Sequence, residues 1–72
     1  MNAQTEQQFI QWMADHLQNK ALMDSSESLE YAKELYYPFL EDNNTYFDDE
    51  EYSWCREDAE NLVDIDMSYW DC

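Results

Sequence analysis

Carboxylates are the side chains with which this sequence is best equipped to do chemistry. Eighteen Asp and Glu residues stand against three Lys and Arg, which gives the 72 residues a formal charge of -15. Two runs concentrate the acids, Asp48-Asp49-Glu50-Glu51 and Glu57-Asp58-Ala59-Glu60. Unpaired carboxylates attract cations and the basic side chains of other proteins. The natural partners of the chain are therefore expected to carry positive charge.

The negative charge is unevenly distributed along the chain. Residues 1–40 hold six acids and two bases, whereas residues 41–72 hold twelve acids and one base, and so carry -11 of the -15. Arg56 and Glu60 have the spacing of a helical ion pair, as do Glu30 and Lys33, but three bases leave most acids unpaired. Because such self-repulsion destabilises a compact chain, the acidic surface is expected to serve binding to a basic site.

The density of charge resembles that of a nucleic acid. A 72-residue globule has a radius of gyration near 11 Å and so a diameter of roughly 25–30 Å, and B-DNA carries about 15–17 phosphates over that length. Acids four apart on a helix, such as Glu30 and Glu34, are about 6 Å apart along its axis. Acids two apart on a strand, such as Asp64 and Asp66, are about 6.6 Å apart. Both separations approach the phosphate spacing along one strand, roughly 7 Å.

Catalytic and metal-binding patterns are weak. A pair of His16 with Cys55 is sterically conceivable, but no third group orients it for nucleophilic catalysis. One His and two Cys do not match a zinc pattern, and residues 42–53 lack the Gly and final Glu of a calcium loop. We expect no enzyme activity, no cofactor and no specific metal site. Cys55 and Cys72 are expected to be free thiols, although one bridge between them is an alternative.

Several further classes of protein are disfavoured. The chain contains no Gly, which phosphate-cradling loops require for close backbone approach, so a nucleotide-dependent enzyme is not expected. Its charge repels nucleic acids and anionic lipids, so we expect no direct nucleic-acid binding and no membrane binding. No apolar run reaches the roughly 20 residues of a membrane span, and residues 1–8 do not resemble a signal peptide. A cytoplasmic location is expected.

The first of three amphipathic segments runs over residues 5–22, with apolar residues at steps of three, four and seven. Thr5 and Gln8 match a capping box at its start. Lys20 suits the negative end of the helix dipole. In the absence of Gly, Asn19 is expected to supply the turn that ends the helix.

The second segment begins where Asp24 and Glu27 have the spacing of another capping box. Pro38 lacks a backbone N–H and disfavours helical dihedrals at the residue before it. This helix is therefore expected to end near Tyr36, with a kink or a short turn after it. Residues 41–45 are expected to form a loop in which Asn43 and Asn44 tolerate left-handed dihedrals.

The third segment is expected to begin with the acidic run at residues 48–51 and to continue as a helix with an inward apolar stripe. From Val63 to Tyr69, apolar and polar residues alternate with the period of a half-buried strand. This end could remain helical, pair with its copy in a dimer, or lie extended across the helices. The expected fold is all-α, a compact three-helix domain over residues 1–72 with an irregular or extended C-terminal tail. A homodimer is also compatible with so small a core.

Aromatic residues are abundant, twelve in all. Rings among carboxylates suit an Arg-rich interface, because guanidinium groups pair with acids and stack on rings. Trp54 and Trp12 fall off the main apolar stripes of their segments and are expected to be exposed. Tyr46, Trp54 and Trp70 are therefore predicted to be stacking anchors for a partner.

In these respects the chain resembles the small acidic DNA-mimic inhibitors encoded by phages and other mobile elements, including anti-restriction and anti-CRISPR proteins. The resemblance is one of character, carried by short length, aromatic content and the runs Asp48-Asp49-Glu50-Glu51 and Glu57-Asp58-Ala59-Glu60. No motif transfers a site from these proteins. What the resemblance implies is a mode of action, in which carboxylates replace phosphates in the nucleic-acid channel of a defence or DNA-handling protein.

The sequence thus predicts a non-catalytic inhibitor that blocks the basic cleft of a host nucleic-acid-binding protein, acting in the host cytoplasm if it is phage-encoded. One alternative is an acidic adaptor or antitoxin-like regulator that binds a basic protein surface without imitating DNA. Another is a segment that folds only on binding. The predicted contact residues are Glu41, Asp42, Tyr46, Asp48, Asp49, Glu50, Glu51, Trp54, Glu57, Asp58, Glu60, Asp64, Asp66 and Trp70.

Overall fold

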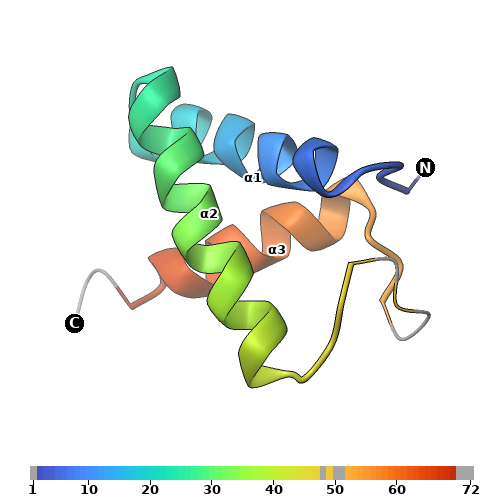
Figure 1. Ribbon diagram of the computed structural model, residues 1–72. Helices are drawn as coiled ribbons and strands as arrows, with labels where there is room; N and C mark the ends of the chain where they lie inside the picture. Colours follow the sequence, from blue (N-terminus) through green and yellow to red (C-terminus); the bar gives the residue numbers. More distant parts are fainter. Residues whose placement is uncertain (1, 48, 50–51, 70–72) are drawn as a thin grey trace.

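Three α-helices make up most of the structure, a computed structural model that describes residues 2–47, 49 and 52–69. Figure 1 shows α1 and α3 side by side, with α2 crossing both. The radius of gyration is 11.6 Å. No strand occurs among the described residues, so the prediction of an all-α three-helix domain is confirmed. The helices are α1 (Glu6–Ala21), α2 (Ser25–Asp42) and α3 (Arg56–Met67).

The start of α1 follows the predicted capping pattern closely. The Thr5 hydroxyl accepts a hydrogen bond from the Gln8 N–H at 3.1 Å. The Gln8 side chain reaches back to accept from the Gln4 N–H at 2.8 Å, one residue earlier than in a capping box. Both contacts satisfy backbone donors that a helix start leaves without partners. The predicted helix over residues 5–22 is confirmed to within one residue at each end.

The end of α1 differs from the prediction. Asn19 lies within the helix, and Leu22 takes the left-handed conformation with φ 57° and ψ 32°. With no Gly in the chain, a Leu holds the position at which helices commonly place Gly. The strain is tolerated because this turn lets α2 begin at Ser25 and fold back against α1.

Replacing Leu22 with Gly should raise the free energy of unfolding by about 1 kcal/mol, because a left-handed residue with a Cβ costs roughly 1–2 kcal/mol. Leu22 is 88% exposed, so the substitution removes little packing. Urea denaturation measures the change. Leu22→Ala is the control, since it shortens the side chain but keeps the Cβ. Equal stability of the Gly and Ala variants would contradict the assignment of strain to this residue.

The α2 helix begins as predicted but continues beyond its predicted end. The Asp24 carboxylate accepts from the Glu27 N–H at 2.7 Å and caps the start. The predicted end near Tyr36 is wrong, because α2 continues through Pro38 to Asp42. Proline in a helix interior costs about 3 kcal/mol, but the next turn contains Phe39, which is half-buried against the core. Burial of this turn outweighs the local preference against helix.

The predicted loop at residues 41–45 consequently starts two residues later. Asn43 ends α2, and both its backbone N–H and its side-chain amide donate to the Phe39 carbonyl, at 3.1 and 2.9 Å. Asn44 has φ 50°, as expected for an Asn that tolerates left-handed dihedrals. The Thr45 N–H then donates to the Leu40 carbonyl at 3.0 Å. The loop is thereby attached to the end of α2.

The α3 helix is shorter than predicted. It begins at Arg56 rather than in the acidic run at residues 48–51, because Trp54 has φ 56°, which a right-handed helix cannot contain. Of the three alternatives for the chain end, the helix is the one realised up to Met67, and the strand-like alternation after Val63 does not produce a strand. The predicted irregular tail therefore cannot begin before Ser68, and residues 70–72 lie outside the described residues.

The core lies where α1 packs on the other two helices. Tyr36 of α2 is fully buried against Phe9 of α1, with ring centroids 5.9 Å apart. The Tyr36 hydroxyl is buried and makes no hydrogen bond to the described part of the chain. Burial, and next the negative charge of Glu6, raise the pKa of Tyr36. The buried hydrophobic residues are Ala3, Phe9, Ile10, Met13, Ala14, Leu17, Ala32, Tyr36, Trp54, Ala59 and Val63.

Replacing Tyr36 with Phe should raise the free energy of unfolding by about 1 kcal/mol at neutral pH, because it removes a desolvated polar atom. The folded-state pKa of Tyr36 is raised, so the free energy of unfolding is unaffected by this titration below the unfolded pKa of about 10. It falls as the pH rises from there through the folded value, because the phenol ionises first in the unfolded chain. Tyr36→Phe should therefore flatten the loss of stability above about pH 10. Urea denaturation at neutral and alkaline pH checks both results. If the parent protein and Tyr36→Phe lost the same free energy of unfolding above about pH 10, the predicted role of the Tyr36 phenol would be contradicted.

Candidate protein-binding surface

Trp54, predicted as an exposed anchor, instead lies at the centre of an aromatic cluster. It is only 4% exposed. The ring centroids of Phe47, Phe9 and Tyr52 lie 5.2, 5.3 and 5.5 Å from that of Trp54, and Phe39 is at 6.5 Å. The prediction was wrong because it placed Trp54 on a helical wheel, whereas the residue precedes α3 and points its ring inward. Trp54 is therefore part of the core.

Hydrogen bonds hold the loop before α3 in this arrangement. The Trp54 indole N–H donates to the Asp49 carbonyl at 2.8 Å. The Trp54 carbonyl accepts from the Ala3 N–H at 2.8 Å, which ties the loop to the N-terminal segment. The Thr45 hydroxyl donates to the Asp49 carboxylate at 2.7 Å. Trp12, also predicted to be exposed, is half-buried against the core.

The other two predicted anchors have different outcomes. Tyr46 is 78% exposed, so its ring is accessible to a partner. Trp70 lies outside the described residues, as do the predicted contact acids Asp48, Glu50 and Glu51. Their roles stay predictions.

Several of the predicted contact acids lie at helix ends that disfavour negative charge. Glu41 and Asp42 are exposed in the last turn of α2, and Asp64 and Asp66 lie in the last turn of α3. The C-terminal end of a helix carries a partial negative charge, and neither last turn contains a base. Only acids such as Glu57, in the first turn of α3, complement the dipole. The placement of the other four does not serve helix stability.

Five of the predicted contact acids contact other side chains of the chain. Three of these contacts are with neutral hydroxyl groups, which orient a carboxylate without neutralising its charge. A carboxylate has about four acceptor sites, so an acid with one donor retains capacity for a partner protein. The Arg56–Glu60 ion pair predicted from spacing is present. The contacts are Thr45 with Asp49, Ser53 with Asp58, Arg56 with Glu60 at 3.3 Å, His16 with Asp64 at 2.7 Å, and Tyr31 with Asp66 at 2.6 Å.

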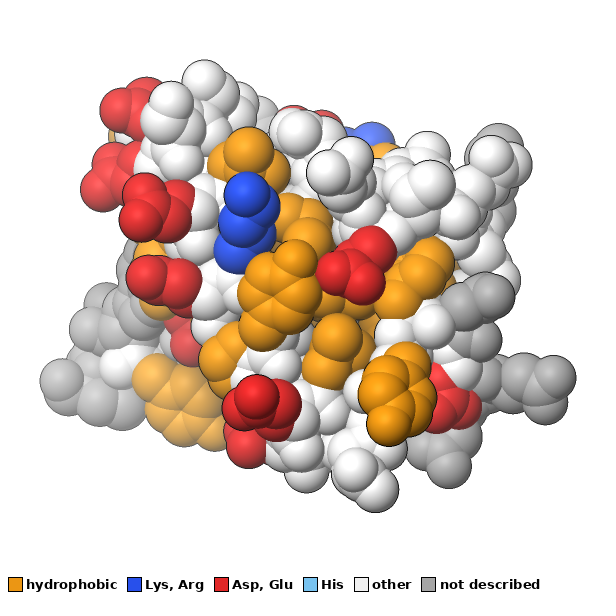
Figure 2. All heavy atoms as spheres, viewed as in Figure 1, with side chains coloured by type: hydrophobic (Ala, Val, Ile, Leu, Met, Phe, Trp, Pro, Cys, Tyr) orange, Lys and Arg blue, Asp and Glu red, His pale blue; other side chains and the backbone are white. Residues whose placement is uncertain are grey.

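An acidic row on α2 was missing from the predicted contact set. Glu27, Glu30 and Glu34 are exposed and line a shallow depression together with Tyr31. The hydroxyl of Tyr31 donates to Asp66, so the row is joined to the end of α3. Figure 2 shows acidic side chains following one another along the N-terminal half of α2. Their spacing of three and four residues was a signal for this row, although most acids lie later in the chain.

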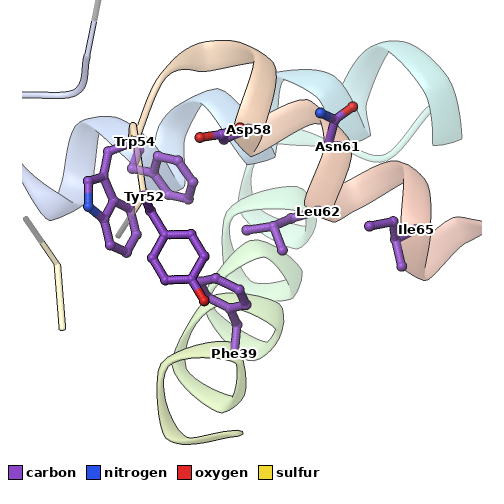
Figure 3. A pocket seen from close by; sticks show the side chains of 8 residues that line it. Phe39, Tyr52, Trp54, Asp58, Asn61, Leu62 and Ile65 are labelled. Atoms are coloured by element: carbon purple, nitrogen blue, oxygen red, sulfur yellow. The ribbon is translucent and has the colours of Figure 1, made fainter. Parts of the chain in front are cut away.

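An apolar groove lies between the C-terminal half of α2 and α3. Two hollows of about 160 and 420 Å³ share Phe39, Leu62 and Ile65, and we call their combined length the α2–α3 groove. Figure 3 shows the smaller hollow, where Leu62 and Ile65 of α3 lie across from Phe39 and Tyr52. The lining residues of the two hollows are Phe9, Glu34, Leu35, Pro38, Phe39, Asp42, Asn43, Tyr52, Trp54, Asp58, Asn61, Leu62, Ile65, Asp66 and Tyr69.

Acids from both helices line this groove. Asp58 of α3 lines the smaller hollow, and Asp66 of α3 lines the larger one together with Glu34 and Asp42 of α2. Within the described residues, Glu34 and Asp42 form no ion pair. The groove therefore combines apolar walls with carboxylates on two sides, which suits a ligand that is both apolar and cationic.

The reactive side chains singled out in the sequence, His16 and Cys55, lie apart from each other. His16 contacts Asp64, whereas the free Cys55 thiol lies 3.4 Å from the Ser53 hydroxyl, so the conceivable His16–Cys55 pair is not formed. Across residues 2–47, 49 and 52–69, no group of three or more His, Cys, Asp and Glu side chains is placed to hold a metal ion. In the same residues, no helix combines the length and apolarity needed to cross a membrane.

The excess of acids should make the fold more stable in salt. Between about 10 and 300 mM salt the screening length falls from about 30 Å to under 10 Å, which weakens repulsion among exposed carboxylates. The melting temperature should rise over this range by several degrees, because a net charge of -15 is unbalanced by internal cations. Circular dichroism melting curves measure it. A flat or falling melting temperature would mean that the acids are better paired than the structure indicates.

Comparison of the chain with known protein families, curated proteins and solved structures found no match. Function is therefore inferred from the surface described above.

Proposed function

We propose that this protein is a non-catalytic inhibitor that presents carboxylates in place of nucleic-acid phosphates and blocks the basic cleft of a nucleic-acid-binding protein. The target is a host defence or DNA-handling protein of the kind that anti-restriction and anti-CRISPR proteins inactivate. The inhibitor itself does not bind nucleic acid. It acts in the cytoplasm that contains its target.

The observation that carries the proposal is the placement of acids where they do not help the fold. Glu41 and Asp42 repel the negative end of α2, and Glu30 and Glu34 are exposed beyond its first turn without a facing row of bases. Charges that destabilise a small domain are retained when binding needs them. A basic cleft would bind these carboxylates rapidly, because complementary charge accelerates encounter.

The α2–α3 groove favours a second candidate function. Phosphate mimicry needs charge but no apolar walls, whereas an acidic adaptor or antitoxin-like regulator would bind a basic protein through charge and apolar contact together. The walls formed by Phe39, Leu62 and Ile65 supply such contact. The two candidates differ in whether the bound partner can still bind nucleic acid.

A competition experiment tests the proposal. The tagged protein is used to isolate basic proteins from a host lysate, and each purified candidate is then offered a labelled DNA or RNA duplex. The inhibitor should displace the duplex, and excess duplex should displace the inhibitor from the same site. A complex that binds both at once would contradict phosphate mimicry and support the adaptor. The control uses the protein at high salt, where charge-driven binding weakens.

A further inference from the structure

We infer that the α2–α3 groove receives the apolar face of a cationic amphipathic helix of the partner protein. The inference rests on the proposed function only because it requires a basic partner. It adds which part of that partner binds in the groove. Two features of the groove support it: side chains that remain exposed although they are apolar, and carboxylates at matching intervals on both helices.

Several apolar residues of the groove remain exposed in the described part of the chain. Ile65, which lines both hollows, is 58% exposed, and Tyr69 at the end of the larger hollow is 70% exposed. Leu62 and Phe39 are half-buried beside them. A ligand entering the groove would therefore remove apolar surface from water, which is the main source of affinity in helix-in-groove recognition.

The carboxylates have the spacing of about two helical turns. Asp58 and Asp66 on α3 are eight residues apart, as are Glu34 and Asp42 on α2, and eight residues correspond to about 12 Å of rise in each helix. Apolar anchors at positions i, i+3 or i+4, and i+7 of a bound helix extend over about 10.5 Å. Lys and Arg on both flanks of that apolar stripe would then face acids on both walls of the groove.

Other occupants fit the charge less well. A second copy of the chain would bring another -15 against the acids of the groove. Residues 70–72 include Asp71, whose carboxylate would add to those of Glu34, Asp42 and Asp66. A neutral apolar helix would bring no cation to Glu34 and Asp42, which form no ion pair within the described residues. Only a ligand that is both cationic and apolar matches the apolar walls of the groove and the carboxylates beside them.

A designed peptide tests the inference on the full chain. The probe is a fluorescent peptide of about 14 residues, with Leu at helical i, i+3, i+4 and i+7 spacing and Lys elsewhere. A second peptide has the same composition in an order without helical amphipathicity. In a binding titration at about 150 mM salt, the amphipathic peptide should bind at least about tenfold more tightly. Equal affinities would overturn the inference, because charge alone would then explain binding.

Two variants locate the binding site. Ile65→Ser should weaken binding of the amphipathic peptide by about three- to tenfold and leave the scrambled peptide unaffected, because it removes apolar surface without changing charge. Tyr69→Ser, at the other end of the groove, should act in the same direction. Leu22→Ser is the matched control, since it removes an 88% exposed aliphatic side chain outside the groove. Circular dichroism establishes that each variant is folded.

Failure here is distinguishable from failure of the proposed function. If Ile65→Ser and Leu22→Ser bind the amphipathic peptide equally well, the helix does not enter the groove, yet competition with duplex can still succeed. If sedimentation shows a dimer that Ile65→Ser dissociates, the groove is an interface between copies and the inference is wrong. If the peptide binds as expected but the protein displaces duplex from none of its basic partners, the adaptor function is favoured over phosphate mimicry.

Discussion

Replacement of Trp54 with alanine is expected to lower the free energy of unfolding by about 3–5 kcal/mol, the range for removing a large buried aromatic side chain. The substitution deletes ring contacts with residues from α1, α2 and the loop, and also the indole hydrogen bond to Asp49. A domain of this size has a total stability of roughly 4–11 kcal/mol. The variant should therefore lose a large share of its stability, which urea denaturation measures as a lower midpoint and near-ultraviolet circular dichroism as loosened aromatic packing.

Tyr46→Ala is the control for this experiment. Tyr46 is an aromatic residue of the same acidic half of the chain, but it is 78% exposed. Its removal should change the free energy of unfolding by no more than about 0.5 kcal/mol, as is usual at the surface. If instead Trp54→Ala were harmless to stability and abolished partner capture, Trp54 would be the exposed anchor that the sequence suggested, and the aromatic cluster would be wrong.

Neutralising Glu41 and Asp42 together is expected to weaken partner binding and to strengthen the fold. In the Glu41→Gln/Asp42→Asn double variant, two exposed carboxylates are lost from the surface proposed to face the partner, so affinity at about 100 mM salt should fall by about tenfold or more. The salt dependence of binding should also become shallower. The melting temperature should rise by a few degrees, because both acids repel the C-terminal end of α2.

The matched control changes the net charge equally on another helix. Glu6→Gln/Asp15→Asn also removes two carboxylates, but from α1, where neither was predicted to contact the partner. Its effect on binding should be much smaller. Equal losses in the two double variants would indicate attraction to net charge alone. A loss of both binding and stability in Glu41→Gln/Asp42→Asn would mean that these acids support the fold, which contradicts the reasoning from the helix dipole.

Most features that depend on near neighbours in the chain were predicted well, although among the described residues the Glu30–Lys33 pair is not formed and Leu22 rather than Asn19 ends α1. Thr5 and Asp24 cap their helices because the N–H groups that they accept from lie three residues away. The Arg56–Glu60 pair forms across one helical turn. Asn44 takes the left-handed conformation that its own side chain tolerates. None of these features needs information from a distant part of the sequence.

Two larger errors occurred where distant segments meet. Local preference ended α2 before Pro38, but packing of the following turn against the core carries the helix to Asp42. Helical periodicity placed Trp54 on a surface, but four rings from α1, α2 and the loop before α3 enclose it. An apolar residue near a helix start can face the core or the solvent, and the spacing of its neighbours did not distinguish the two.

In the candidate surface, too, some features follow from the sequence alone and others from tertiary packing. The excess of carboxylates and its bias toward residues 41–72 are properties of composition, which no fold can change. The α2–α3 groove, by contrast, brings together residues that are distant in the sequence. Tyr31 and Asp66 are 35 positions apart, and His16 and Asp64 are 48 positions apart. Such contacts depend on how α2 and α3 pack on α1, because burial of apolar side chains is not directional and allows many arrangements of the same three helices. Tertiary packing therefore decided which acids surround an apolar groove.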